Sequence, residues 1–230
     1  MKKNEQNFEE SGKVEELSKL SDEIKLIPAF QKIEKKEDLV GTLFAFFKTL
    51  TREEKIIFQI LFDSINPLSI REIRKRYLLT YVSILEKDNK KEKILEIIKN
   101  LREKIEKEKD VSPSSLIENL NDAETSKLIS EINKKILSYP KIPSYYKIKK
   151  ILEYFENLGL VTKRELEGRK AESIWLLSPS FSKICSSVVS YIETKEERTS
   201  IEVEVYYYIT GKIIDNFKYP YLVALQRALQ

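Results

Sequence analysis

The stretch SYYKIKKILEYFENLGLVTKRELEGRKAESIWLL, residues 144–177, runs from one kind of periodicity into another. Its first half repeats apolar residues three or four positions apart, which is typical of an amphipathic helix. Its second half holds two short apolar segments on either side of a turn at Glu167 and Gly168. The pattern predicts a helix followed by a β-hairpin with Arg169 and Lys170 in a basic tip.

The helix in this stretch has clear ends and two distinct faces. Ser144 is a suitable N-cap, and Gly159 supplies the left-handed residue that ends the helix. The buried stripe is expected to contain Ile148, Ile151, Leu152, Phe155 and Leu158. At about 100° per residue, the residues that point away from it are Tyr146, Lys150, Glu153 and Asn157, with Lys149 alongside.

Composition sets the broad class of protein. The chain has 230 residues, of which 41% are hydrophobic and 34% charged, which indicates a folded protein with a heavily charged surface. The formal net charge is only +4, so any attraction to a polyanion must come from local clusters of basic residues.

Several classes of enzyme are excluded by residues that are missing. The chain has no histidine, which excludes Ser-His-Asp and Cys-His catalysis and histidine-based zinc sites. Its five glycines are scattered and form neither a P-loop nor a dinucleotide-binding turn. The triplet ETK at 193–195 has the E-x-K form of some metal nucleases, but in so Glu- and Lys-rich a chain it is expected by chance. We therefore expect a non-enzymatic protein without catalytic residues, metal or cofactor.

The environment of the protein follows from its cysteine and its apolar segments. The single cysteine, Cys185, cannot form an internal disulfide, and the first residues do not have the pattern of a secretory signal. No apolar run approaches the length that crosses a bilayer. We expect a cytoplasmic protein with no membrane partner.

Three helices are predicted before residue 88. The first lies in EDLVGTLFAFFKTL from Glu37, and the second follows a T-x-x-E capping box at Thr51 and Glu54. A second capping box at Ser69 and Glu72 opens the third, after a break at Asn66-Pro67. The buried positions are expected to be Ile56, Ile57, Ile60 and Leu61 in the second helix and Ile70, Ile73, Tyr77 and Leu78 in the third.

Residues 88–143 are predicted to form a helical hairpin. A charged helix over 86–110 carries an apolar stripe, and a further helix over 115–137 offers apolar partners for it. The stripe consists of Ile94, Ile97, Ile98, Leu101 and Ile105, and the partners are Leu128, Ile129, Ile132, Ile136 and Leu137.

The two ends of the chain are expected to differ. Residues 1–23 form a flexible acidic start, and 24–50 a helical extension. The C-terminal helical region, 179–230, contains a helix after Pro179 with Phe181, Ile184, Val188 and Ile192 inward, and a last helix starting at Pro220. Residues 201–210 fit both strand and helix, and we favour helix. The Leu, Val and Tyr content of the last thirty or so residues suggests a homodimer interface in this region.

Two capped helices, a third ending in LEYFENLGLV and a basic hairpin follow one another in this chain, and this order resembles the winged helix-turn-helix family. The resemblance covers about 51–87 and 144–178, and the pattern of these segments is similar to that of the C-terminal winged domain of archaeal origin-recognition initiators. It implies a mainly α fold: a winged-helix domain at 51–178 with a small β-hairpin wing at 161–177, extra terminal helices and the insertion at 88–143. Such an insertion is unusual between the second and third helices. Either a helical hairpin is inserted there, or the second helix is assigned wrongly.

The resemblance also implies double-stranded DNA as the partner, with a role in transcription regulation or replication initiation. The helix at 145–158 would enter the major groove, with Ser144 at a phosphate. The residues that would contact DNA are Tyr145, Tyr146, Lys149 and Lys150 on this helix, Arg71, Arg74, Lys75 and Arg76 on the second helix, and Lys163, Arg164, Arg169 and Lys170 on the wing.

Two other interpretations compete with DNA binding. Exposed tyrosines and lysines are often only a solvated helix face. Winged helices also serve as protein-protein interaction scaffolds, and Glu153, Glu156, Glu165 and Glu167 near the DNA face would oppose phosphate. If Glu153 and Glu165 flank the lysines on one surface, the scaffold interpretation gains.

Overall fold

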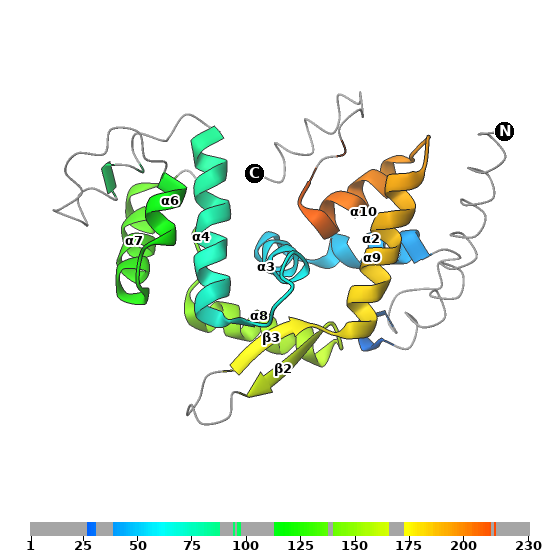
Figure 1. Ribbon diagram of the computed structural model, residues 1–230, viewed down its shortest axis with the longest axis horizontal. Helices are drawn as coiled ribbons and strands as arrows, with labels where there is room; N and C mark the ends of the chain where they lie inside the picture. Colours follow the sequence, from blue (N-terminus) through cyan, green and yellow to red (C-terminus); the bar gives the residue numbers. More distant parts are fainter. Residues whose placement is uncertain are drawn as a thin grey trace.

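The protein is mainly helical and carries a small three-stranded antiparallel sheet at one end (Figure 1). The computed structural model describes residues 27–30, 39–87, 94, 96–97, 113–137, 140–165, 173–212 and 214. Within these residues no helix is long and apolar enough to cross a membrane.

The elements follow the predicted order closely. A short 3-10 helix, η1 (Pro28–Phe30), precedes the helices α2 (Leu39–Thr49) and α3 (Arg52–Phe62). The strand β1 (Leu68–Ser69) leads directly into α4 (Ile70–Lys87), and α6 (Pro113–Glu118) and α7 (Asp122–Lys135) come next. The chain continues through α8 (Tyr145–Asn157), β2 (Val161–Glu165), β3 (Ser173–Leu177), α9 (Pro179–Thr194) and α10 (Ser200–Thr210).

The two strands predicted after α8 are present, and β3 lies in the middle of the sheet. It pairs antiparallel with β2, where Val161 faces Leu177, and with β1, where Leu68 faces Trp175. Trp175 is 1% exposed, so the central strand ties the sheet to the core. No pattern in the sequence predicts β1, because two residues are too few to show the alternation of a strand.

Both predicted capping boxes are confirmed. The Glu54 carboxylate accepts the Thr51 backbone N–H at 2.7 Å, and the Thr51 hydroxyl accepts the Glu54 N–H at 3.4 Å. Glu72 and Ser69 make the same reciprocal pair, at 2.7 and 3.2 Å. Ser69 therefore ends β1 and caps α4 at once, which fixes where the helix leaves the sheet.

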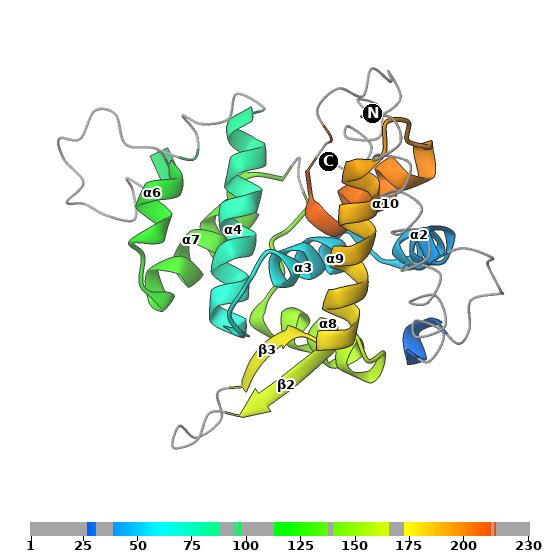
Figure 2. The same cartoon turned by 45° about the vertical axis from the view of Figure 1, so that its right-hand side comes forward.

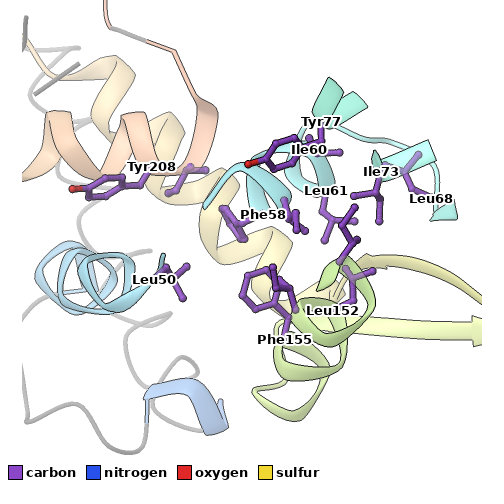
Figure 3. Close-up of a cluster of buried hydrophobic side chains, with 14 of the residues drawn as sticks. Leu50, Phe58, Ile60, Leu61, Leu68, Ile73, Tyr77, Leu152, Phe155 and Tyr208 are labelled. Atoms are coloured by element: carbon purple, nitrogen blue, oxygen red, sulfur yellow. The ribbon is translucent and has the colours of Figure 1, made fainter. Parts of the chain in front are cut away.

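The core surrounds α3 (Figure 3), where Phe58 is fully buried among side chains from several other elements. Its ring centroid lies 5.1 Å from that of Phe47 on α2 and 5.7 Å from that of Phe181 on α9. Leu152 and Phe155 of α8 close the core from below in this view. The predicted buried positions of α3, α4 and α8 are buried, except that Ile56 and Leu158 are only partly so.

The junction between α8 and β2 is built around Gly159, as predicted. This residue has φ of 73°, and its N–H donates to the Glu156 carbonyl at 2.9 Å while Leu160 N–H donates to Phe155 at 2.9 Å. This pattern is a Schellman motif, which satisfies carbonyls at the helix end. Ser178, just after β3, donates its hydroxyl to the Gly159 carbonyl at 2.9 Å. The helix end and the sheet are therefore joined by direct hydrogen bonds.

The described part of the insertion between α4 and α8 contains the helices α6 and α7, and the helix predicted after the capping box at Ser69 and Glu72 is present as α4. In two views α6 and α7 lie beside α4, on its side away from α3 (Figures 1 and 2). The single helix expected over 115–137 is wrong, because Asn121 starts a new helix with its own capping box. Leu137 was expected inward and is 79% exposed, since α7 ends before it. Most of the helix predicted over 86–110 lies outside the described residues, although Ile94 and Ile97 are buried.

Residues 201–210 are helical in α10, which confirms the favoured interpretation. α10 packs against α2, α3 and α9, and its Val205, Tyr208 and Ile209 are buried within the chain, whereas Ile201 is exposed. Packing inside one chain therefore buries much of the apolar surface of this region up to residue 210, and the homodimer interface stays a prediction. The helix expected from Pro220 and the flexible start at 1–23 lie outside the described residues.

Candidate nucleic-acid interface

The N-terminus of α8 is formed as the sequence predicts. Ser144 has an extended backbone, with φ of −70° and ψ of 161°, and its hydroxyl accepts the Lys147 N–H at 3.2 Å. Because the hydroxyl caps the helix, Ser144 is a structural residue first. Its predicted contact with phosphate stays a prediction.

The four groove candidates on α8 are all exposed. Tyr146 has 63% of its surface exposed and Tyr145 44%, and both lysines are exposed as well. The Lys150 ammonium lies 4.7 Å from the centroid of the Tyr146 ring, one helical turn earlier. The first two turns of α8 therefore present aromatic rings and positive charge together.

Acidic groups accompany the lysines farther along the surface. The Glu153 carboxylate lies 3.7 Å from the Lys149 ammonium, and that of Glu165 lies 3.5 Å from the Lys163 ammonium. Both acids flank lysines, and this is the arrangement that favours a protein-protein interaction surface over DNA. Half-exposed pairs of this kind are worth about 0.2–1 kcal/mol each, so a phosphate can displace either carboxylate.

Lys147 has a role that the sequence does not reveal. Its ammonium lies 2.8 Å from the Glu53 carboxylate on α3, a residue 94 positions earlier. Burial raises the pKa of Glu53, but the hydrogen bond from Lys147, a backbone hydrogen bond and the charges of Lys147 and Arg52 together outweigh it, and the pKa lies below its ordinary value. This ion pair holds the first turn of α8 on α3, which fixes the orientation of the exposed tyrosines and lysines. A contact between positions so far apart leaves no local signal in one sequence.

Three of the basic residues of α4 contact the insertion. Arg71 pairs with Asp122 on α7 at 2.8 Å, and Arg74 donates to the Ser126 hydroxyl at 3.0 Å. The Lys75 ammonium donates to two carbonyls near the end of α6, those of Glu118 at 2.7 Å and Leu120 at 2.9 Å. These side chains hold α6 and α7 on α4, and their predicted contact with the DNA backbone stays a prediction.

The remaining basic candidates differ in what the structure shows of them. Arg76 on α4 and Lys163 and Arg164 on β2 are exposed. Arg169 and Lys170, with the turn between the strands, lie outside the described residues. The described part of the β2–β3 hairpin therefore carries two basic residues at the same end of the molecule as α8 (Figure 1).

The E-x-K triplet at 193–195 is engaged in packing between α9 and α10. Glu193 accepts the Tyr206 hydroxyl at 3.0 Å, and Lys195 donates to Glu202 at 2.8 Å. Each charged group in the triplet thus has a structural partner. In the part of the chain that the structure describes, no three acidic, cysteine or histidine side chains come together as metal ligands.

The chain matches no protein-family model, no curated protein and no solved structure.

Proposed function

We propose that this protein is a non-enzymatic, winged-helix protein that binds double-stranded DNA. The supporting observation is the connectivity: α3, β1, α4, α8, β2 and β3 follow one another, with β3 between β1 and β2 in the sheet. This is the order expected for a winged helix, with α6 and α7 inserted before its third helix. A role in transcription regulation or in replication initiation is in keeping with such a module.

The first two turns of α8 are the part that would enter the major groove. Tyr145, Tyr146, Lys149 and Lys150 are exposed there, and the acids of this helix come later, from Glu153 onwards. Recognition helices present their N-terminal residues to the bases, so the position of the basic half suits that geometry. Lys163 and Arg164 on β2 would reach neighbouring phosphates.

A titration of fluorescent mixed-sequence duplex tests this proposal. We expect salt-dependent binding that weakens between about 50 and about 200 mM salt and collapses in Lys149→Glu/Lys150→Glu. The matched control is Lys127→Glu/Lys183→Glu, which makes the same charge change at exposed lysines of α7 and α9 and should bind nearly as wild type. Equal loss in both variants would show only a general charge effect and would contradict the assigned surface.

A protein-protein interaction scaffold is the second candidate function. The observation that favours it is the pairing of Lys149 with Glu153 and of Lys163 with Glu165, which leaves a surface of mixed charge around exposed tyrosines. Tyrosine is enriched at protein interfaces. Absence of DNA binding by the wild-type chain at about 50 mM salt would move the protein into this class.

A further inference from the structure

The contacts between α4 and the insertion have a feature that pure packing does not explain. Three basic side chains of α4, those of Arg71, Arg74 and Lys75, are bound by polar groups of α6, α7 and the turn between them. Arg71 and Asp122 form their ion pair with side chains that are 61% and 63% exposed, so solvent and competing anions reach it. An ion pair in that position is weak and exchangeable.

The same interface leaves polar atoms without partners. Arg74 Nε and the hydroxyl of Thr125, which precedes Ser126 on α7, are buried and have no hydrogen-bond partner among the described residues. A buried polar atom without a partner costs free energy. The polar contact between α4 and α7 is therefore less favourable than a fully satisfied one, and Arg74 can gain by finding another acceptor.

The arginines also lie close to the proposed DNA surface. α4 begins immediately after β1, whose Ser69 pairs with Ile174 of β3, and α4 packs against α8 as well. The first turn of α4, which carries Arg71, is thus next to the sheet whose edge strand holds Lys163 and Arg164 (Figure 1).

We propose that α7 masks a second phosphate-binding surface on α4, formed by Arg71 and Arg74, and so limits the affinity of the protein for DNA. Asp122 and Ser126 occupy the guanidinium groups that would otherwise bind phosphate oxygens, for which the planar guanidinium is well suited. Release of these contacts turns the two arginines towards the nucleic acid. This proposal rests on the proposed DNA binding and concerns its regulation.

The test compares salt dependence in two matched variants of the full chain. Asp122→Asn/Ser126→Ala removes the carboxylate that pairs with Arg71 and the hydroxyl that accepts from Arg74, whereas Glu131→Gln/Ser130→Ala makes the same chemical change elsewhere on α7, at an acid that pairs with Lys134 and Lys135. Each arginine that gains a phosphate steepens the slope of log K against log salt by about 0.9. We expect a slope steeper by about 0.9 to 1.8 in the first variant only, which is about a 3- to 12-fold larger loss of affinity between about 50 and about 200 mM salt.

A third protein identifies the groups responsible. Adding Arg71→Gln/Arg74→Gln to Asp122→Asn/Ser126→Ala should return the slope to the wild-type value. If the wild type binds DNA and Asp122→Asn/Ser126→Ala has the slope and affinity of the control, the masking is refuted while DNA binding stands. If the wild type does not bind, both proposals fail. Circular dichroism of each variant verifies that the helices are retained.

Discussion

The substitution Gly159→Ala is predicted to destabilise the folded chain at the junction between α8 and β2. Gly159 ends α8 in the left-handed region, at φ of 73°, and a Cβ placed there would lie 3.1 Å from Cδ of Pro28. An L-residue in this region lowers the stability of the folded state by about 1–2 kcal/mol, because its Cβ lies too close to the following carbonyl. A glycine-to-alanine change also reduces the conformational freedom of the unfolded chain, which offsets about 0.4–1 kcal/mol of this loss in stability.

The contact with Pro28 decides the size of the effect. Cδ belongs to a proline ring and cannot rotate away as the end of a flexible side chain would, so the overlap adds an overpacking cost of about 1 kcal/mol or more. The sum predicts a loss of about 1–3 kcal/mol in the free energy of unfolding. The double variant Pro28→Ala/Gly159→Ala lacks the proline ring, so it should recover the part of the stability loss that overpacking causes.

Urea denaturation followed by tryptophan fluorescence measures this loss. Trp175 is the single tryptophan of the chain and lies buried in the central strand, so its emission reports on the sheet next to the substituted residue. We expect a lower denaturation midpoint with an unchanged dependence on urea. A midpoint equal to or above that of the wild type would refute the assignment of Gly159 as the strained end of α8.

Three further predictions concern other contacts. Lys147→Met should destabilise the protein at neutral pH and by less in acid. Folding lowers the pKa of Glu53, so the stabilisation from its carboxylate is present above the ordinary pKa of 4.5 and is lost as the pH falls through the folded value. Equal effects of the substitution at pH about 7 and about 3 would contradict the ion pair. Gln59→Leu should lower the free energy of unfolding, measured by urea denaturation, by about 1–3 kcal/mol. The Gln59 amide donates to two carbonyls in the last turn of α10, at 3.0 and 3.2 Å, and an unchanged stability would contradict this capping role. Cys185 should react with a thiol reagent only after denaturation, since complete burial raises its pKa and blocks access, and rapid labelling of the native protein would show that α9 is packed differently.

Local signals were sufficient to predict most of the described elements. The capping boxes at Thr51 and Ser69 and the glycine after α8 each depend on residues within a few positions of one another, so one sequence contains the whole motif. The apolar stripe of α8 is equally local, and it predicted correctly which face of the helix is buried.

Features that depend on contacts between distant segments could not be predicted. The break between α6 and α7 is an exception: its capping box at Asn121 and Glu124 is local, but the apolar pattern of 115–137 appears continuous and hides it. The roles of Arg71, Arg74 and Lys147 are set by partners about fifty to almost a hundred positions away. The charged residues of a helix show where positive charge lies, but only the tertiary structure shows which charges are already paired.

The most direct test of the central claim is an NMR titration of isotope-labelled protein with a short DNA duplex at low salt. The account predicts that the largest amide shifts occur at 145–150 and 161–165, with little change in α10, which lies on the other side of the core. Absence of shifts, or shifts concentrated away from α8 and β2, would contradict the claim that this surface binds DNA.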